Sequence, residues 1–234
     1  MHERRRHPEL MDHPGLDGIR HVHALQGLAR LNGWSLSGRT VWHPLARLAR
    51  DTATPLRVLD LACGGGDNTI RIARRAERAR IPMQFDACDI SERALDHAAK
   101  QAARAGVSIR FYQQDVLSDP IRGNYDAVMS SLFLHHLADD EAVAVLAGMA
   151  RAADRLVLVT DLVRSRAGLG LAHLACRLLT RSEIVRYDGP QSVRSAFTID
   201  EARQLAARAG LAATVRPVWP ERFVLTARLN AAQV

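Results

Sequence analysis

The stretch Val58-Leu-Asp-Leu-Ala-Cys-Gly-Gly-Gly66 decides the fold of this chain. It begins as a short apolar run, Arg57 to Leu61, and ends in three consecutive glycines, which is typical of a buried strand that leads into a turn. A helix is expected next, over residues 68–80. Because glycines let a ligand approach the backbone, and a helix start offers free N–H groups, this turn predicts a ligand-binding loop.

Strands and helices alternate along the rest of the chain. Apolar runs and capping residues predict strands at 83–88, 108–113, 125–131 and 155–160, with helices at 91–104 and 140–153. The capping box Thr198-Ile-Asp-Glu201 opens another helix, which closes at Gly210. Two last strands, 213–218 and 223–228, are so closely connected that they must pair antiparallel. We therefore predict an α/β fold with a doubly wound, mostly parallel seven-stranded sheet, an antiparallel last strand and N-terminal helices.

The first 50 residues differ from this pattern. Residues 1–14 are polar and predict an extended arm, whereas the apolar spacing from Leu16 to Leu31 predicts an amphipathic helix that ends at Asn32-Gly33. A second helix is expected over residues 41–50. We divide the chain into an N-terminal helical arm or lid, residues 1–50, and a main domain, residues 51–234.

The composition of the chain bears on its possible partners and on its location in the cell. The chain has 32 Lys plus Arg against 25 Asp plus Glu, but the arginines are spread along it and only 5% of residues are aromatic, so we expect no nucleic-acid partner. Its three cysteines form no C-x-x-C pair, and no run of about 20 apolar residues occurs. With no apolar core after the basic start, we expect a cytoplasmic protein without a membrane span. A homodimer stays open as the assembly.

Three acids follow three consecutive strands. Asp60 ends the first, Asp89 the second and Asp115 the third. A dinucleotide-binding loop would need a third glycine where this chain has Thr69, and Asp60 would repel a pyrophosphate. A cationic ligand fits better, and S-adenosylmethionine supplies a sulfonium and an ammonium. Asp89 can accept from ribose hydroxyls, and Asp115 from the adenine amine.

Together, the loop, the three acids and Tyr125-Asp-Ala-Val-Met-Ser-Ser131 resemble class I S-adenosylmethionine-dependent methyltransferases, with their Rossmann-like domain, over residues 55–230. Ala62 stands where that family has its first glycine. The resemblance implies a set of cofactor-binding residues, namely Asp60, Ala62, Cys63, Gly64, Asp89, Ile90, Asp115, Val116 and Ser131. It is nearest to small-molecule enzymes of the ubiquinone and menaquinone type. The opening Arg6-His-Pro-Glu-Leu-Met-Asp12 further resembles methyltransferases encoded beside polyketide synthases, which implies secondary metabolism.

Two histidines follow the fourth strand, beside the expected methyl group. His135 and His136 are the candidate catalytic residues, because histidine can act as a base near neutral pH. The alternative is that one of them only caps the following turn. No metal site is expected, since His21 and His23, two residues apart on a helix, point to different sides.

The segment 163–196 is expected to form the acceptor side. Its apolar stretch, 168–179, predicts a core or lid helix or the wall of a lipophilic pocket, and Tyr187 and Asp188 are candidates to reach a polar head group. We therefore predict methyl transfer to an oxygen or carbon of a small phenolic, quinone-like or polyketide-derived acceptor. The alternatives are an RNA or protein methyltransferase, a nicotinamide oxidoreductase, and a cofactor-binding regulator without catalysis.

Overall fold

The computed structural model describes residues 3–12, 15–34 and 37–229. One seven-stranded sheet runs through the molecule in the order β3-β2-β1-β4-β5-β7-β6. Its strands are β1 (Leu56–Leu61), β2 (Met83–Asp89), β3 (Ile109–Gln113), β4 (Tyr125–Ser131), β5 (Ala153–Leu162), β6 (Ala213–Val218) and β7 (Arg222–Arg228). The first five are parallel, and β7 is antiparallel to both β5 and β6. The predicted fold class is confirmed.

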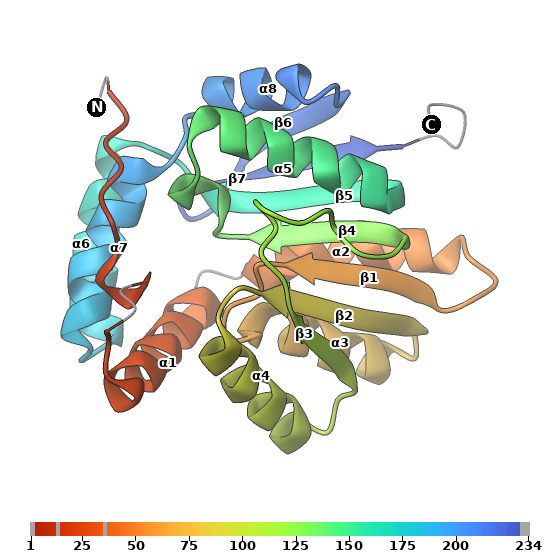
Figure 1. The fold of residues 1–234 in the computed structure, drawn as a ribbon, viewed down its shortest axis with the longest axis horizontal. Helices are drawn as coiled ribbons and strands as arrows, with labels where there is room; N and C mark the ends of the chain where they lie inside the picture. The colour runs from red at the N-terminus through yellow and green to blue at the C-terminus, as the bar shows by residue number, and fades with distance from the viewer. Residues whose placement is uncertain (1–2, 13–14, 35–36, 230–234) are drawn as a thin grey trace.

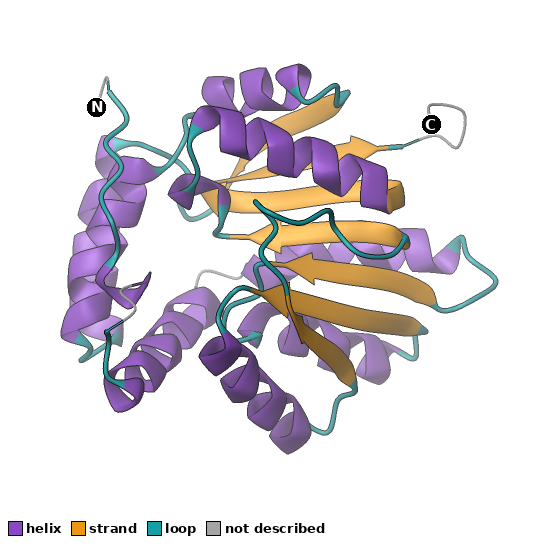
Figure 2. Cartoon of the chain, in the orientation of Figure 1, coloured by secondary structure: helices purple, strands orange, loops and turns teal. Residues whose placement is uncertain are grey.

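Helices cover both faces of the sheet (Figures 1 and 2). One core cluster joins the sheet to α2 (Ser37–Arg50), α3 (Asp67–Ala79) and α4 (Glu92–Ala105), and the other joins it to α5 (Asp139–Ala152) and α8 (Ile199–Arg208). Leu59, Leu158 and Phe223 are fully buried between these layers. Because every strand of the centre is covered on both sides, its sequence is a continuous apolar run rather than an alternating one.

Local capping explains why several helices begin and end where they do. The Ser91 side chain accepts a hydrogen bond from the Ala94 N–H at the start of α4, and Gly106 closes that helix in a left-handed conformation. At α8, Thr198 and Glu201 form the predicted capping box. These boundaries follow from side chains close by in sequence, which is why the sequence predicts them well.

The N-terminal segment departs further from expectation. Helix α1 (Gly18–Trp34) continues through Asn32-Gly33 instead of ending there. Helix α2 is part of the core, with Val41, Trp42 and Leu45 buried against the sheet layer. Helix α2 covers one face of the sheet, as the other core helices do. Of the described N-terminal residues, only the arm and α1 lie over the carboxyl ends of the strands. The division at residue 50 stays a prediction.

The extended N-terminal arm, described over residues 3–12, lies along the segment 163–196, where Figure 1 draws it in red in front of two cyan and blue helices. This segment forms two helices, α6 (Arg166–Leu179) and α7 (Glu183–Ser195), where the sequence predicted one. Asp188 is buried in α7 and accepts hydrogen bonds from the backbone N–H groups of Leu10 and Met11, at 2.9 and 3.0 Å. Its expected role at a head group is therefore wrong: Asp188 fastens the arm.

Arg4 fastens the other end of the arm. Its guanidinium donates to the carbonyl oxygens of Ser195 and Leu137, at 2.6 and 2.7 Å, and stacks 3.6 Å from the centre of the Phe197 ring. A cation that meets carbonyl oxygens and an aromatic face together is held more firmly than one in a surface ion pair. The arm is thus ordered by long-range contacts that its polar sequence does not reveal.

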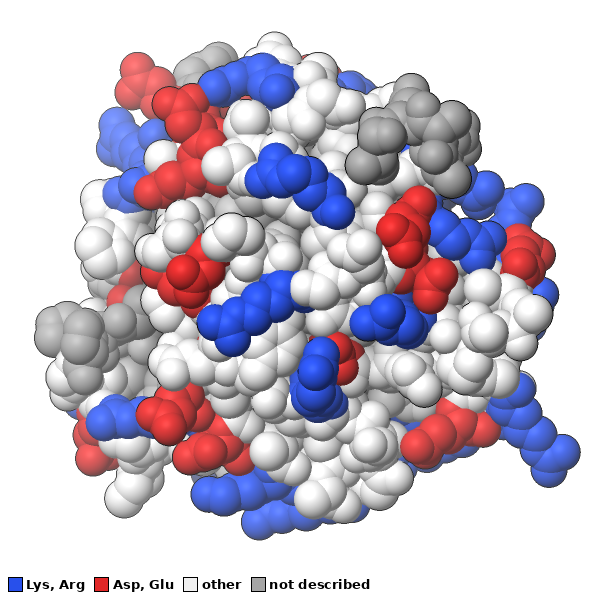
Figure 3. Space-filling view, turned by 45° about the vertical axis from the view of Figure 1, so that its right-hand side comes forward, with Lys and Arg blue, Asp and Glu red and all other residues white. Residues whose placement is uncertain are grey.

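Two features bear on partners. No helix in the described part of the chain is both long enough and apolar enough to cross a membrane. On the face seen in Figure 3, basic and acidic side chains are interspersed over the surface. A continuous basic surface, which a nucleic-acid partner would require, is not present on that face.

Candidate active site

A cavity of about 440 Å³ opens at the carboxyl ends of the strands. It is lined by every residue predicted to bind the cofactor and by both candidate histidines: Asp60, Ala62, Cys63, Gly64, Asp89, Ile90, Asp115, Val116, Ser131, His135 and His136. Parallel strands end at one edge, so residues far apart in sequence converge there. Leucines of α1 and apolar residues of α6 and α7 form the opposite wall.

The glycine loop turns sharply between β1 and α3. Ala62 and Gly64 both have positive φ, at 54° and 52°. Gly66, at φ 71°, is the N-cap of α3, and a Cβ there would lie 2.8 Å from the Cβ of Ala98. Glycine at 66 therefore permits a backbone conformation and a close packing of α3 on α4 that a side chain would prevent.

Asp60 lies at the base of this loop and is 2% exposed. One carboxylate oxygen accepts a hydrogen bond from the hydroxyl of Thr69, the residue that replaces a third glycine. The other, Oδ1, is buried with no hydrogen-bond partner among the described residues, as is Oδ1 of Asn68. Burial raises the pKa of Asp60 to about 7. Two unpartnered acceptors lining the cavity fit a ligand that brings N–H donors and positive charge.

Asp89 and Asp115 shape the loops that follow β2 and β3. Asp89 accepts from the N–H groups of Gly64 and Ser91, at 2.7 and 2.9 Å, so it joins the glycine loop to the start of α4. Asp115 accepts from the N–H of Leu117 at 2.9 Å, and this hydrogen bond and those of Ser118 lower its pKa. Each carboxylate oxygen has a second lone pair, so these contacts leave room for ligand hydroxyl or amine donors.

Removing the Asp89 carboxylate should weaken binding of S-adenosylmethionine. Asp89→Ala removes both the expected ribose contacts and the bond to Gly64, and charged hydrogen bonds contribute about 1.5–3 kcal/mol. Titration calorimetry is expected to show that loss, whereas Asp96→Ala, on the exposed side of α4, should bind as the unmodified protein does. Unchanged affinity in a folded Asp89→Ala protein would contradict the assignment.

The histidine pair lies where β4 ends. His135, only 3% exposed, places its Nδ1 2.7 Å from Asp161, whose other carboxylate oxygen accepts from the His135 backbone N–H at 3.0 Å. Burial alone would lower the pKa of His135, but the charges of Asp161 and Glu9 outweigh it and raise the pKa to about 10. A histidine so held cannot readily accept a proton near neutral pH, which leaves His136 as the better candidate for a base.

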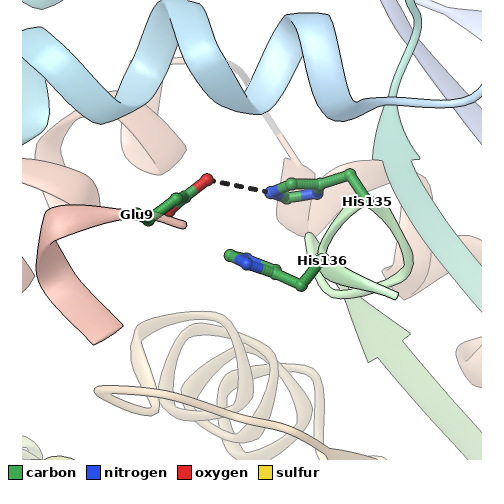
Figure 4. Close-up of side chains that lie close together, drawn as sticks. All are labelled: Glu9, His135 and His136. Atoms are coloured by element: carbon green, nitrogen blue, oxygen red, sulfur yellow. Dashed lines mark ion pairs between the residues drawn. The ribbon is translucent and has the colours of Figure 1, made fainter. Parts of the chain in front are cut away.

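The N-terminal arm contributes Glu9 to the same place (Figure 4). Its carboxylate oxygen is 3.7 Å from Nε2 of His135 and accepts a hydrogen bond from the Ser192 hydroxyl on α7. Burial would raise the pKa of Glu9, but His135, His136 and Ser192 lower it to about 2. The two imidazole rings lie 4.2 Å apart, centre to centre.

Sequence reasoning missed several polar residues in or beside this cavity. Asp161, which contacts the lining residue His135, follows the fifth apolar run, so the rule that found Asp60, Asp89 and Asp115 would have found it. Glu9, Asn68 and Arg222 carry no such local mark, because only the tertiary fold brings them to the strand ends. His21, for which the sequence suggests no site, is buried and lines the cavity. Tyr187 is half-exposed and is not among the lining residues that the structure describes.

Known proteins resemble the chain in sequence and fold. Residues 58–155 match the family model described as a methyltransferase domain. An uncharacterised methyltransferase of Mycobacterium tuberculosis (strain ATCC 25618 / H37Rv) is 34% identical over 53% of this chain and 61% of its own. A ubiquinone biosynthesis O-methyltransferase of Caulobacter sp. (strain K31) is 30% identical over 58% of this chain and 55% of its own. The chain thus spans about half the length of the curated relatives it matches.

Solved structures share the fold across nearly the whole chain. Magnesium protoporphyrin IX methyltransferase from Synechocystis PCC 6803, crystallised with bound SAH, superposes with a TM-score of 0.60 at 18% identity, covering 94% of this chain and 91% of the other. An O-methyltransferase from neocarzinostatin biosynthesis, in complex with S-adenosyl-L-homocysteine and 1,4-dihydroxy-2-naphthoic acid, gives 0.67 at 21% identity over 91% and 59%.

Strand order, the glycine loop and these matches define the class of protein. Residues 58–155 carry a methyltransferase domain, as the sequence predicts, and the chain shares the fold of methyltransferases crystallised with S-adenosylmethionine or its product. Among the curated relatives, those with named reactions include quinone methyltransferases. The predicted family and cofactor are confirmed at this level.

Proposed function

We propose that this protein transfers the methyl group of S-adenosylmethionine to an oxygen or carbon of a small lipophilic acceptor. One observation carries the proposal: a single cavity joins the cofactor-type loops of β1, β2 and β3 to an apolar wall of α1, α6 and α7. A pocket that is mostly apolar with a few polar groups buries most of an aromatic ligand and orients it by those groups.

S-adenosylmethionine supplies an activated methyl group, because the electron pair of the breaking carbon–sulfur bond stays on sulfur. The chain's own residues bind, orient and exclude water. Asp60 and Asn68 would offer acceptors to the amino acid end of the cofactor, Asp89 and Asp115 would offer them to the ribose and adenine, and Val116 would contact the adenine. In-line transfer depends on such positioning, which supplies most of the rate.

The acceptor end of the cavity is chemically distinct. Leu28, Leu171 and Ala175 line it with carbon, and His135 and His136, in the turn after β4, supply polar groups. The arginines of segment 163–196 do not line it among the described residues; Arg164, for example, forms a two-pronged pair with Glu201 at 2.7 Å. Arg222 is the one arginine among the described lining residues, and the negative charges of Asp161 and Asp67 act on its guanidinium. These features favour a phenol, quinol or similar polyketide-derived compound.

A panel of acceptors with labelled cofactor tests this proposal. Phenols and quinols should accept label, and carboxylates and nucleosides should not. Transfer only to carboxylates, nucleosides, RNA or protein would show the proposed acceptor class to be wrong. Cofactor binding without turnover on any member, including an extract of small molecules, would favour the non-catalytic regulator.

A further inference from the structure

Three potential metal ligands from distant parts of the chain meet at the acceptor end of the cavity. Glu9 comes from the arm, and His135 and His136 from the turn after β4 (Figure 4). One ligand atom from each lies within 4.8 Å of the others. The sequence predicts no metal site, because the carboxylate and the histidines are far apart in it and neither segment alone has a metal-binding pattern.

The spacing suits a shared cation better than a direct bond. The 3.7 Å between Glu9 Oε1 and His135 Nε2 is too long for a hydrogen bond. Two ligands of a tetrahedral zinc ion, with bonds of about 2.0–2.1 Å, lie about 3.3 Å apart. A cation between these atoms would therefore need only small movements of the side chains.

A second layer of residues orients two of the three ligands, His135 and Glu9. Asp161, 1% exposed, lies 2.7 Å from His135 Nδ1, and an acceptor at Nδ1 directs Nε2 toward a cation, as in the carboxylate–histidine–metal arrangement. Ser192 donates to Glu9, and Asp188 holds the two residues that follow Glu9 in the arm. Supporting contacts of this kind are what distinguish a built site from a chance cluster.

We propose that Glu9, His135 and His136 bind one divalent first-row transition cation, with Zn²⁺ as the probe. Two histidines and one carboxylate are a ligand set of catalytic zinc sites, which keep an open position. Binding displaces the proton on His135 Nε2 to solvent, and two carboxylates, Glu9 and Asp161, balance the charge of the cation. In the metal-bound protein His136 would be a ligand and would not act as the base. All three ligand residues line the cavity, so an open position on the cation would be reached from it. There, and this part rests on the proposed function, the cation would hold and polarise an acceptor oxygen.

Metal binding is tested first, without cofactor or acceptor. The untagged full chain is stripped with chelator, dialysed, and titrated with Zn²⁺ by calorimetry and with Co²⁺ by visible absorption. One equivalent should bind, with the d–d bands of a four- or five-coordinate nitrogen and oxygen site. Glu9→Gln and His136→Ala should each weaken binding beyond the roughly 10–100-fold that loss of a supporting residue costs, and Asp161→Asn by about that amount.

Matched controls keep the test specific. Glu3→Gln, in the same arm, and His43→Ala, on α2, alter exposed residues and should bind as the unmodified chain does. No saturable binding, binding unchanged in both Glu9→Gln and His136→Ala, or a cobalt–thiolate band from the cysteines would overturn the proposal. In that case Glu9 and protonated His135 form an ion pair only.

Activity separates this inference from the proposed function. If both hold, chelator should abolish methyl transfer without changing S-adenosylmethionine affinity, and Zn²⁺ should restore it. Transfer that persists in the chelated protein contradicts the metal site's role and leaves the methyltransferase proposal standing. Failure to bind S-adenosylmethionine contradicts the proposed function, whatever the metal titration shows.

Discussion

The substitution Asp60→Asn should stabilise the cofactor-free protein more at pH 8 than at pH 4, in comparison with the unmodified protein. The same variant should bind S-adenosylmethionine more weakly. Burial raises the pKa of Asp60 to about 7, roughly three units above that of an exposed aspartate. At about 1.4 kcal/mol per unit, ionising this carboxyl in the folded state costs about 4 kcal/mol. A stability cost at a site with an unpartnered buried oxygen is expected of a binding residue.

The direction of the pH dependence follows from the raised pKa. Between about pH 4 and pH 7 the folded protein holds a proton on Asp60 that the unfolded chain has lost, so the free energy of unfolding falls as the pH rises through this window. The amide side chain of the Asp60→Asn variant cannot ionise, so it lowers the free energy of unfolding by only a small amount that does not change with pH. The difference in unfolding free energy, variant minus unmodified, should therefore rise by about 4 kcal/mol from pH 4 to pH 8.

Urea unfolding at several pH values measures this difference. Calorimetry with S-adenosylmethionine tests the predicted effect on binding. The affinity of the unmodified protein should rise with pH up to about 7, because the cationic ligand favours the ionised carboxyl. The Asp60→Asn variant should show a weak affinity that does not depend on pH. Asp154→Asn, at an exposed position of β5, serves as the control. A flat stability difference would mean that Asp60 is ionised at little cost and has no such role.

Deleting residues 1–12 should abolish efficient turnover while leaving a folded, cofactor-binding protein. The arm contributes Glu9 to the cavity, next to the proposed acceptor site, and is joined to the domain through Arg4 and Asp188. It adds little to the two main core clusters, which are built from the sheet and its helices. Misplaced positioning groups cost on the order of 100-fold, so kcat/KM for the acceptor should fall by at least that factor.

Steady-state kinetics and cofactor calorimetry on the same preparation test the deletion. Asp188→Asn is the point variant, since it weakens the hydrogen bonds to Leu10 and Met11 without shortening the chain, and it should lower kcat/KM in the same direction. Wild-type turnover in the deletion would refute a role for the arm. Removal of residues 1–50 is not an equivalent test, because α2 is buried against the sheet and its loss should unfold the domain.

The sequence determined the parts of this protein that depend on near neighbours. Apolar runs marked all seven strands to within a few residues, and local caps at Ser91 and Thr198 marked helix starts, because both signals lie within a few residues of the structure they specify. It also predicted which strand ends carry cofactor-type residues, because parallel strands place their carboxyl ends at one edge. The position of these residues in the lining of one cavity was thus foreseeable, and their binding of the cofactor stays a prediction.

Only the tertiary structure decided the part of the cavity around Glu9 and the two histidines. Glu9, His21 and Asp188 are polar residues in helices or an arm whose local sequence is equally consistent with exposure to solvent. Their burial depends on α1, α6, α7 and the arm packing over the strand ends, through contacts such as Asp188 to Leu10 that join residues 178 positions apart. Such pairings leave no periodic or motif signal in the sequence, since each is a single contact between distant segments. They are the contacts that bring the Glu9 carboxylate to His135 and His136.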